Sequence, residues 1–191
     1  MLRLIGLVSV LGLLAALAGP VTSAQTLGER EEFTATAIVN NNLGAGAGRV
    51  IMRVNRWSTE AERGTLTRTL LKGGSNDLLD ALRDMKSVGT IRTPDSLAYD
   101  LRYSHQEPGE DGGRRVVLAT DRPIGFWEAA NRPRTIDYPF TVIQMQLDKN
   151  GDGTGTLSFA TKVIARGNTI ELENFASAPA MLTEIRAKKI D

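Results

Sequence analysis

The chain has 191 residues, with 23 basic and 22 acidic side chains and a formal net charge of +1, and it contains no cysteine. A charge balance this close to zero argues against a nucleic-acid-binding protein, because phosphate binding needs an excess of Lys and Arg. The lack of cysteine excludes disulfide bonds, thiolate catalysis and zinc bound through sulfur.

Residues 1–24 have the pattern of a secretory signal peptide. Arg3 supplies positive charge near the N-terminus, and an uncharged apolar run follows from Leu4 to Ala18. The small residues Thr22–Ala24 suit cleavage directly after them, and the run is shorter than the roughly 20 residues that a transmembrane helix needs. We therefore expect an exported protein, periplasmic or secreted, in which residues 25–191 form a single domain with no further transmembrane segment.

The first elements after this leader are predicted to form a β-hairpin. Apolar and polar residues alternate from Phe33 to Val39 and again from Arg49 to Trp57, with the period of two that is typical of strands. Between them, Asn40–Gly48 is rich in Asn and Gly and is predicted to be a flexible loop. Trp57 is expected to pack into the core.

A helical pair follows this hairpin. Thr59 and Glu62 have the spacing of a capping box, in which each side chain bonds a free backbone N–H group of the other residue. A first helix is predicted from about Glu60 to Leu71, and Gly73-Gly74 should end it. A second helix is predicted from Asn76 to Lys86, and its apolar residues share one stripe that should lie on the sheet.

The middle of the chain returns to strand patterns. Val88–Arg92 is predicted to be a short strand, and Leu97–Tyr103 alternates apolar and polar residues. His105–Gly113 is polar and is predicted to be a loop, so that Arg114–Thr120 would return as the hairpin partner. Within that partner, Val116–Ala119 is continuously apolar, which indicates a strand covered on both faces.

The C-terminal half is predicted to be a meander. Its strands are expected at Tyr138–Leu147, Thr156–Arg166, Thr169–Phe175 and Ala180–Lys188, and in the last of them Met181 and Ile185 should face the core. The predicted fold is α+β and mainly β, with about nine mostly antiparallel strands and the helical pair between the second and third. A barrel and a sandwich both fit, and the helical pair could plug an open end or cover one face.

Asp148, Asn150 and Asp152, followed by Gly153, match the start of a calcium-binding EF-hand loop, in which oxygen ligands alternate along the chain. The twelfth position of such a loop carries a Glu, and here it is Phe159. The same residue types are typical of a hairpin turn. We expect a turn that binds calcium no more tightly than the millimolar range, and we expect no other metal or cofactor.

Three carboxylates surround the Pro/Gly turn in the centre of the chain: Asp121, Glu128 and Asp137. Two carboxylates across a cleft could hydrolyse a glycoside, and Trp127 could stack on a sugar. The alternative is structural, since Asp121 could bond N–H groups of the turn and the other two could pair with nearby arginines. No sequence signature distinguishes the two interpretations.

The same region also offers candidate ligand-binding residues. Phe126 and Trp127 leave the turn together, and Arg122 precedes them. Arginines cluster around this turn and could hold an anion through bidentate contacts, or form a solvated rim paired with acids; they are Arg114, Arg115, Arg122, Arg132 and Arg134. We expect Trp127 to lie in the core or, alternatively, to line a pocket or contact a partner.

Two further patterns carry no recognisable site. His105 is the only histidine of the chain, so a site with several histidine ligands is excluded, and it is interpreted as a solvated loop residue. Gly44–Gly48 is glycine-rich, but neither a helix nor a Lys-Ser/Thr pair follows it, as a phosphate-binding loop requires.

Several phrases of the chain resemble those of exported bacterial proteins of uncharacterised function. These phrases are Arg56–Glu60, Tyr99–Tyr103, Leu118–Glu128 and Asp137–Phe140. The resemblance implies a single exported domain, and it supplies no activity, ligand or catalytic residue.

The sequence therefore favours a non-enzymatic exported domain that binds a small or apolar ligand, or a protein partner, in or beside its β-core. Two alternatives remain open. One is a glycoside-type hydrolase that uses the carboxylates near Trp127, and the other is a structural cell-envelope protein whose edge strands pair with a partner. The sequence does not indicate an oligomeric state.

Overall fold

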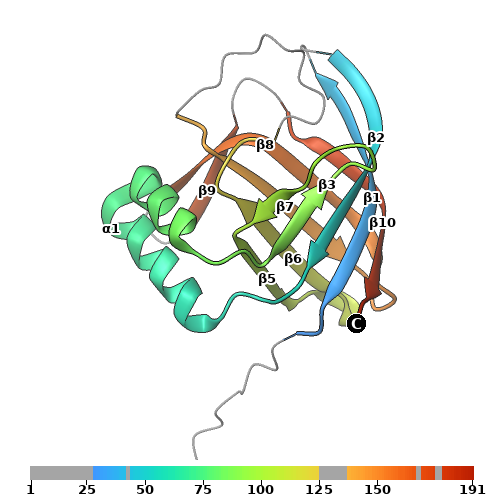
Figure 1. Cartoon of the computed structure of the whole chain (residues 1–191), viewed down its shortest axis with the longest axis horizontal. Coiled ribbons are helices and arrows are strands. Elements are labelled where there is room, and N and C mark those ends of the chain that lie inside the picture. Colours follow the sequence, from blue (N-terminus) through green and yellow to red (C-terminus); the bar gives the residue numbers. More distant parts are fainter. Residues whose placement is uncertain (1–27, 42–43, 125–136, 167–168, 175–177) are drawn as a thin grey trace, which may run out of the picture.

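The computed structural model describes residues 28–41, 44–124, 137–166, 169–174 and 178–191, so the predicted leader lies outside the described residues. Within these ranges the chain forms one antiparallel sheet and one long helix, α1 (Glu60–Asp84) (Figure 1). The strands are β1 (Glu31–Asn41), β2 (Gly44–Val54), β3 (Gly89–Arg92), β4 (Tyr99–Leu101), β5 (Tyr103–Pro108), β6 (Arg114–Thr120), β7 (Phe140–Leu147), β8 (Asp152–Arg166), β9 (Thr169–Asn174) and β10 (Ala180–Lys189).

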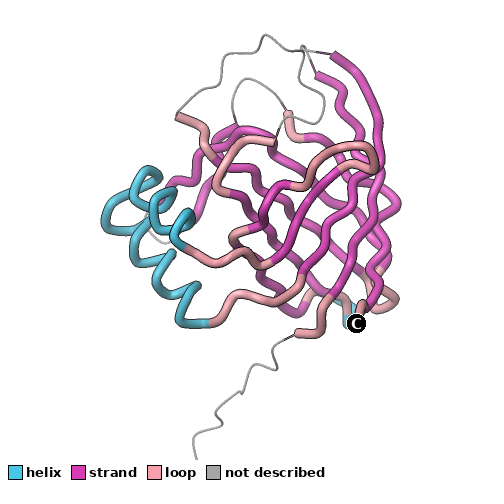
Figure 2. The backbone as a smooth tube through the Cα atoms, viewed as in Figure 1, coloured by secondary structure: helices cyan, strands magenta, loops and turns pink. Residues whose placement is uncertain are grey.

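The sheet curls into a nearly closed barrel. Its strands lie in the order β4-β3-β2-β1-β10-β8-β7-β6-β5, and β9 pairs with β8 outside this series. The two end strands belong to one extended segment, because only Arg102 separates β4 from β5. The Arg102 amide donates to the Ala119 carbonyl of β6 at 2.8 Å, so this segment carries the sheet from β3 across to β6 (Figure 2). The predicted mainly-β α+β fold is confirmed, in its barrel form.

The helix α1 covers one side of the barrel's outer face, over β5 to β9 (Figure 1). The predicted capping box is present: the Glu62 amide donates to Thr59 Oγ1 at 3.2 Å, and the Thr59 amide donates to the Glu62 carboxylate at 2.8 Å. Gly74 has φ 77° and breaks the helix into two segments, as the predicted pair requires. No helix in the described ranges has both the length and the apolar character needed to cross a bilayer.

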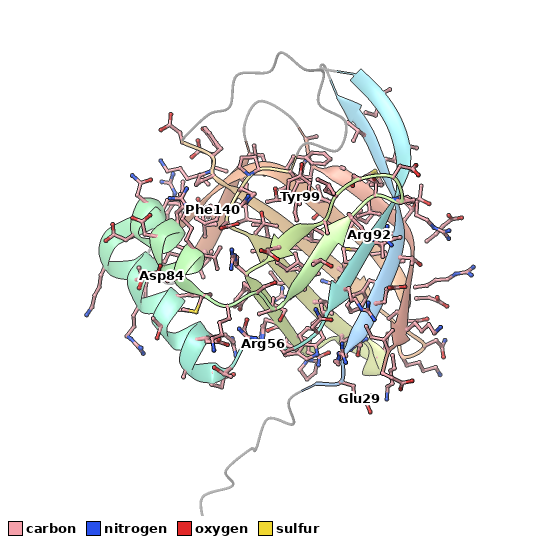
Figure 3. The ribbon with its side chains drawn as sticks, in the orientation of Figure 1. Glu29, Arg56, Asp84, Arg92, Tyr99 and Phe140 are labelled. Atoms are coloured by element: carbon pink, nitrogen blue, oxygen red, sulfur yellow. The ribbon has the colours of Figure 1, made fainter. Side chains whose placement is uncertain are left out.

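Strand β6 shows that the fold has two apolar layers. Val116 and Leu118 are fully buried inside the barrel, whereas Val117 and Ala119 pack outward against the helix. Phe140 of β7 belongs to this outer layer (Figure 3), together with the buried leucines of α1. The prediction that this segment is covered on both faces is confirmed, because each strand face has its own core.

Large side chains fill the barrel interior. The fully buried ones, each less than 2% exposed, include Phe33, Met52, Ile91, Leu101, Leu118, Ile143, Met145, Leu157, Leu182 and Ile185. Trp57 is 5% exposed and its indole N–H donates to the Glu29 carbonyl at 3.0 Å, so its predicted packing role is confirmed. Glu29, which is labelled in Figure 3, lies at the end of the barrel where β1 begins.

Two segments predicted to be loops are strands. Gly44–Gly48 belongs to β2, which pairs with β1 along its whole length up to Asn41↔Gly44. His105 belongs to β5 and lies opposite Val117 of β6. In both segments the composition is that of a loop, and pairing with a neighbouring strand decides the structure instead.

Two apolar residues at alternating positions of predicted strands are exposed. Leu97 lies between a turn and β4 and is 90% exposed. Met181 is 61% exposed, because a bulge in β10 at Glu184, with φ 51°, changes which side chains face inward. Leu182 and Ile185 are both buried, one on each side of this bulge. Strict alternation counted back from Ile185 ignores the bulge, and it therefore places Met181 on the inner face although Met181 is on the outer face.

Candidate functional site

The predicted acid Asp121 is buried in ion pairs. Its carboxylate is 4% exposed and lies 3.2 Å from Arg122 Nε and 3.6 Å from Arg102 Nε. The turn that follows is held by Thr120, whose hydroxyl accepts from the Arg122 amide at 3.3 Å, so the predicted Asx-turn of Asp121 is replaced by a threonine turn. A buried carboxylate paired with two guanidinium groups has the arrangement of a structural ion pair.

The other predicted acids do not join Asp121 in the described part of the chain. Asp137 is exposed and lines an open depression of about 190 Å³ between the kink of α1 and β8, together with Gly73, Ser75, Asn76 and Lys162. Asp121 is not among the residues that line it. Glu128 lies outside the described residues, and so do Phe126 and Trp127. Of the predicted ligand-binding residues only Arg122 is described, with its side chain 57% exposed.

The Asp148–Gly153 motif spans the turn between β7 and β8 and the first two residues of β8. Asp148 Oδ1 accepts from the amides of Asn150 at 2.8 Å and Asp152 at 3.0 Å. These backbone N–H groups lower the pKa of Asp148 below its ordinary value. One oxygen of the predicted calcium ligand is therefore used by the turn itself, and among the described residues no three His, Cys, Asp or Glu side chains are grouped so that they could hold a metal ion.

His105 lies under the first segment of α1, not in a solvated loop. Its ring is 6.4 Å from that of Tyr103, and its Nε2 is 3.9 Å from the Glu107 carboxylate. Burial, and next the positive charge of Arg63 on α1, lower the pKa of His105 below its ordinary value. Burial likewise raises the pKa of Tyr103. This cluster is a packing contact between helix and sheet.

A larger depression of about 380 Å³ opens at the barrel end near Glu29. Among its lining residues, Glu31 is 5% exposed, and its carboxylate accepts from Arg114 at 2.9 and 2.6 Å. Arg114 Nη1 also donates to Gln106 Oε1 at 2.6 Å. The buried charges of this depression satisfy one another, as in a structural ion pair.

At the opposite end of the barrel, the β1–β2 hairpin projects past its neighbours (Figure 1). Strand β10 covers β1 only as far as Ile38, and β3 covers β2 only at Ile51–Val54. Residues 38–41 and 44–50, which we call the lip, therefore form a two-stranded ribbon in which β2 has β1 as its only partner strand among the described residues.

Both faces of the lip are open at Ala45–Ala47, whereas Val39 and Val50 pack against the barrel core. Ala45, Gly46 and Ala47 are exposed, and a Cβ atom placed on Gly46 would meet no atom within 4 Å. On the outer face, Ile38 is 38% exposed and lies directly between Met181 of β10 and Ala47 of β2. The lip thus combines a strand edge with a short apolar stripe, and the alternation of Gly and Ala from Gly44 was the sequence signal that could have revealed it as a strand.

Comparisons with known proteins return nothing similar: no protein-family model matches the chain, and no curated protein and no solved structure matches it either.

Proposed function

We propose that the chain is the precursor of an exported, non-enzymatic β-barrel domain that acts by binding a protein partner through the lip. The observation that carries this proposal is the ribbon with both faces open at Gly46 and Ala47. An isolated two-stranded ribbon is marginally stable in water, and this one presents Gly and Ala instead of large cross-strand pairs. A partner would supply the missing burial.

The packing of the barrel favours a surface partner over an enclosed apolar ligand. The inward-facing side chains from Phe33 to Ile185 are almost fully buried against one another, and the two depressions described above are open and polar-rimmed. The charge pattern and apolar run of residues 1–24 support export. Intact-mass analysis of the product from an exporting host tests that part, with a chain beginning at Gln25 as the expected result.

Site-specific photo-crosslinking in the native host tests the partner. A photoreactive residue at Ala47, on the outer face of the lip, should give a crosslinked product of discrete mass. The matched control is Arg53, which is exposed on the same face of the same strand but beside β3. Equal labelling at both positions, or none at Ala47, would contradict the proposal.

A further inference from the structure

We infer that the partner at the lip is a second copy of this chain, and that the two copies pair antiparallel through their β2 edges at Gly44–Val50. This inference rests on the proposed function and names its partner. In the described residues, the edge of β2 that faces away from β1 receives no backbone hydrogen bond from another strand along this stretch. Such an edge is a template for a further strand.

Strand β9 lies at a second edge of the same sheet, and its side chains protect that edge from pairing with a further strand. Among the described residues, strand β9 has β8 as its only partner, and it carries Glu171 and Glu173, both exposed, with Glu171 paired to Arg166 at 2.8 Å. Charged side chains of this kind discourage further pairing. The β2 edge has no charged residue from Gly44 to Gly48 and no proline, so of these two edges of the described sheet, the β9 edge carries protecting charges and the β2 edge does not.

A two-fold axis through Ala47 gives the β2 edge a self-complementary register. Two-fold pairing is the commonest symmetry of soluble oligomers, and it joins a surface to its own copy. In this register Ala47 lies opposite Ala47 of the second copy, and Arg49 lies opposite Ala45 of the second copy. The only charged side chain of the edge therefore never faces its own copy, whose like charge would oppose the pairing.

The apolar stripe of the lip also becomes continuous in this register. Residues directly opposite each other in an antiparallel pair point to the same face of the sheet. The stripe of Met181, Ile38 and Ala47 would therefore run on into Ala47, Ile38 and Met181 of the second copy. Gly and Ala alone fix a strand register weakly. The register through Ala47 is therefore favoured by the continuous apolar stripe and by the position of Arg49 opposite Ala45.

The projection of the lip leaves room for the second barrel. Strand β3 pairs with β2 only from Ile51 to Val54, so the stretch Gly44–Val50 lies beyond the end of β3. Figure 1 shows β1 and β2 extending past the other labelled strands. The joined molecule would be two barrels linked by one continuous ribbon.

Analytical ultracentrifugation of the exported protein tests this dimer with a charge-swap pair. Ala47→Lys and Ala47→Asp each place like charges opposite one another at the two-fold axis, while in the monomer they change only an exposed side chain. We expect the wild-type chain to dimerise reversibly, and each variant alone to raise the dimer dissociation constant at least about fivefold. An equimolar mixture of the two variants should form a heterodimer at least as tight as the wild-type dimer.

Thr154→Lys is the matched control, because it adds the same charge at an exposed position of β8 away from the lip and should leave the dimer unchanged. A wild-type chain that stays monomeric at every concentration, or variants that dimerise as tightly as the wild type, would overturn the inference. A monomeric chain that still crosslinks through Ala47 to a different protein would overturn only the second-copy assignment. The absence of any crosslink at Ala47 would remove the proposed function as well.

Discussion

At the scale of single residues, a neighbouring strand lies so close to some strand positions that only glycine fits there. A Cβ atom on Gly153 would lie 1.9 Å from the Gln146 carbonyl oxygen of β7, and one on Gly89 would lie 1.9 Å from the Arg53 carbonyl oxygen of β2. Glycine inside a strand weakens it in general, so its presence here reflects the tight coiling of the barrel wall.

Gly153→Ala should therefore destabilise the protein, by about 1–3 kcal/mol, because the backbones of β7 and β8 must separate to admit the methyl group. Gly46→Ala is the matched control within a strand, since its Cβ atom would meet nothing within 4 Å, and it should change the free energy of unfolding by less than about 0.5 kcal/mol. Urea unfolding of dilute protein measures both. Equal effects of the two substitutions would show that strand glycines are interchangeable here.

At the scale of elements, local patterns predicted most of the fold. The capping box at Thr59 and the Gly73-Gly74 break depend on neighbours in the sequence, and both are present. The apolar run Val116–Ala119 implied a strand between two cores, because no residue in it could face water favourably. The helix boundary and the buried central strand were therefore accessible from the sequence.

The errors lie where distant partners decide the structure. His105–Pro108 has the composition of a loop but completes β5 against β6, and the β10 bulge at Glu184 leaves no local signal. Nor does the sequence indicate that Asp121 meets Arg102, because that ion pair depends on the closure of the barrel. The free edge of the lip could not be predicted for the same reason, since it is defined by where β3 and β10 stop pairing.

The contact between α1 and β5 should make stability depend on pH. A histidine whose pKa is lowered in the folded state takes up its proton more readily in the unfolded state, so protonation favours unfolding. Burial and Arg63 lower the pKa of His105 below the ordinary value of 6.5, while Glu107 and Glu60 oppose this and Arg115 of β6 adds to it. We expect stability to be complete at pH 8 and to fall as the pH drops through about 6.5.

His105→Gln should remove this dependence, because the chain has no other histidine and few other groups titrate between pH 5 and 8. Denaturant unfolding between pH 5 and pH 8, on protein without a histidine tag, makes the comparison. A wild-type curve that parallels that of the variant over this range would contradict the assignment of the pH dependence to His105.

At the scale of the whole molecule, the two apolar layers share the strands between them. Strands β6 and β7 contribute Leu118 and Ile143 to the barrel core, and Val117 and Phe140 to the layer under α1. Loss of the helix would expose one face of the strands that hold the barrel together. The helix and the barrel should therefore unfold as one cooperative unit.

Leu82→Ala tests this coupling from the helix side. Leu82 is 3% exposed in the outer layer, so the substitution should cost about 2–5 kcal/mol. Hydrogen exchange should then accelerate by the same factor in β1 and β10, on the far side of the sheet, as in α1. Leu71→Ala, at a site on the same helix that is 57% exposed, should change exchange little in any strand. Faster exchange confined to α1, with β1 and β10 unchanged, would mean that the barrel folds without its helix and that the outer layer is a separate, weaker unit.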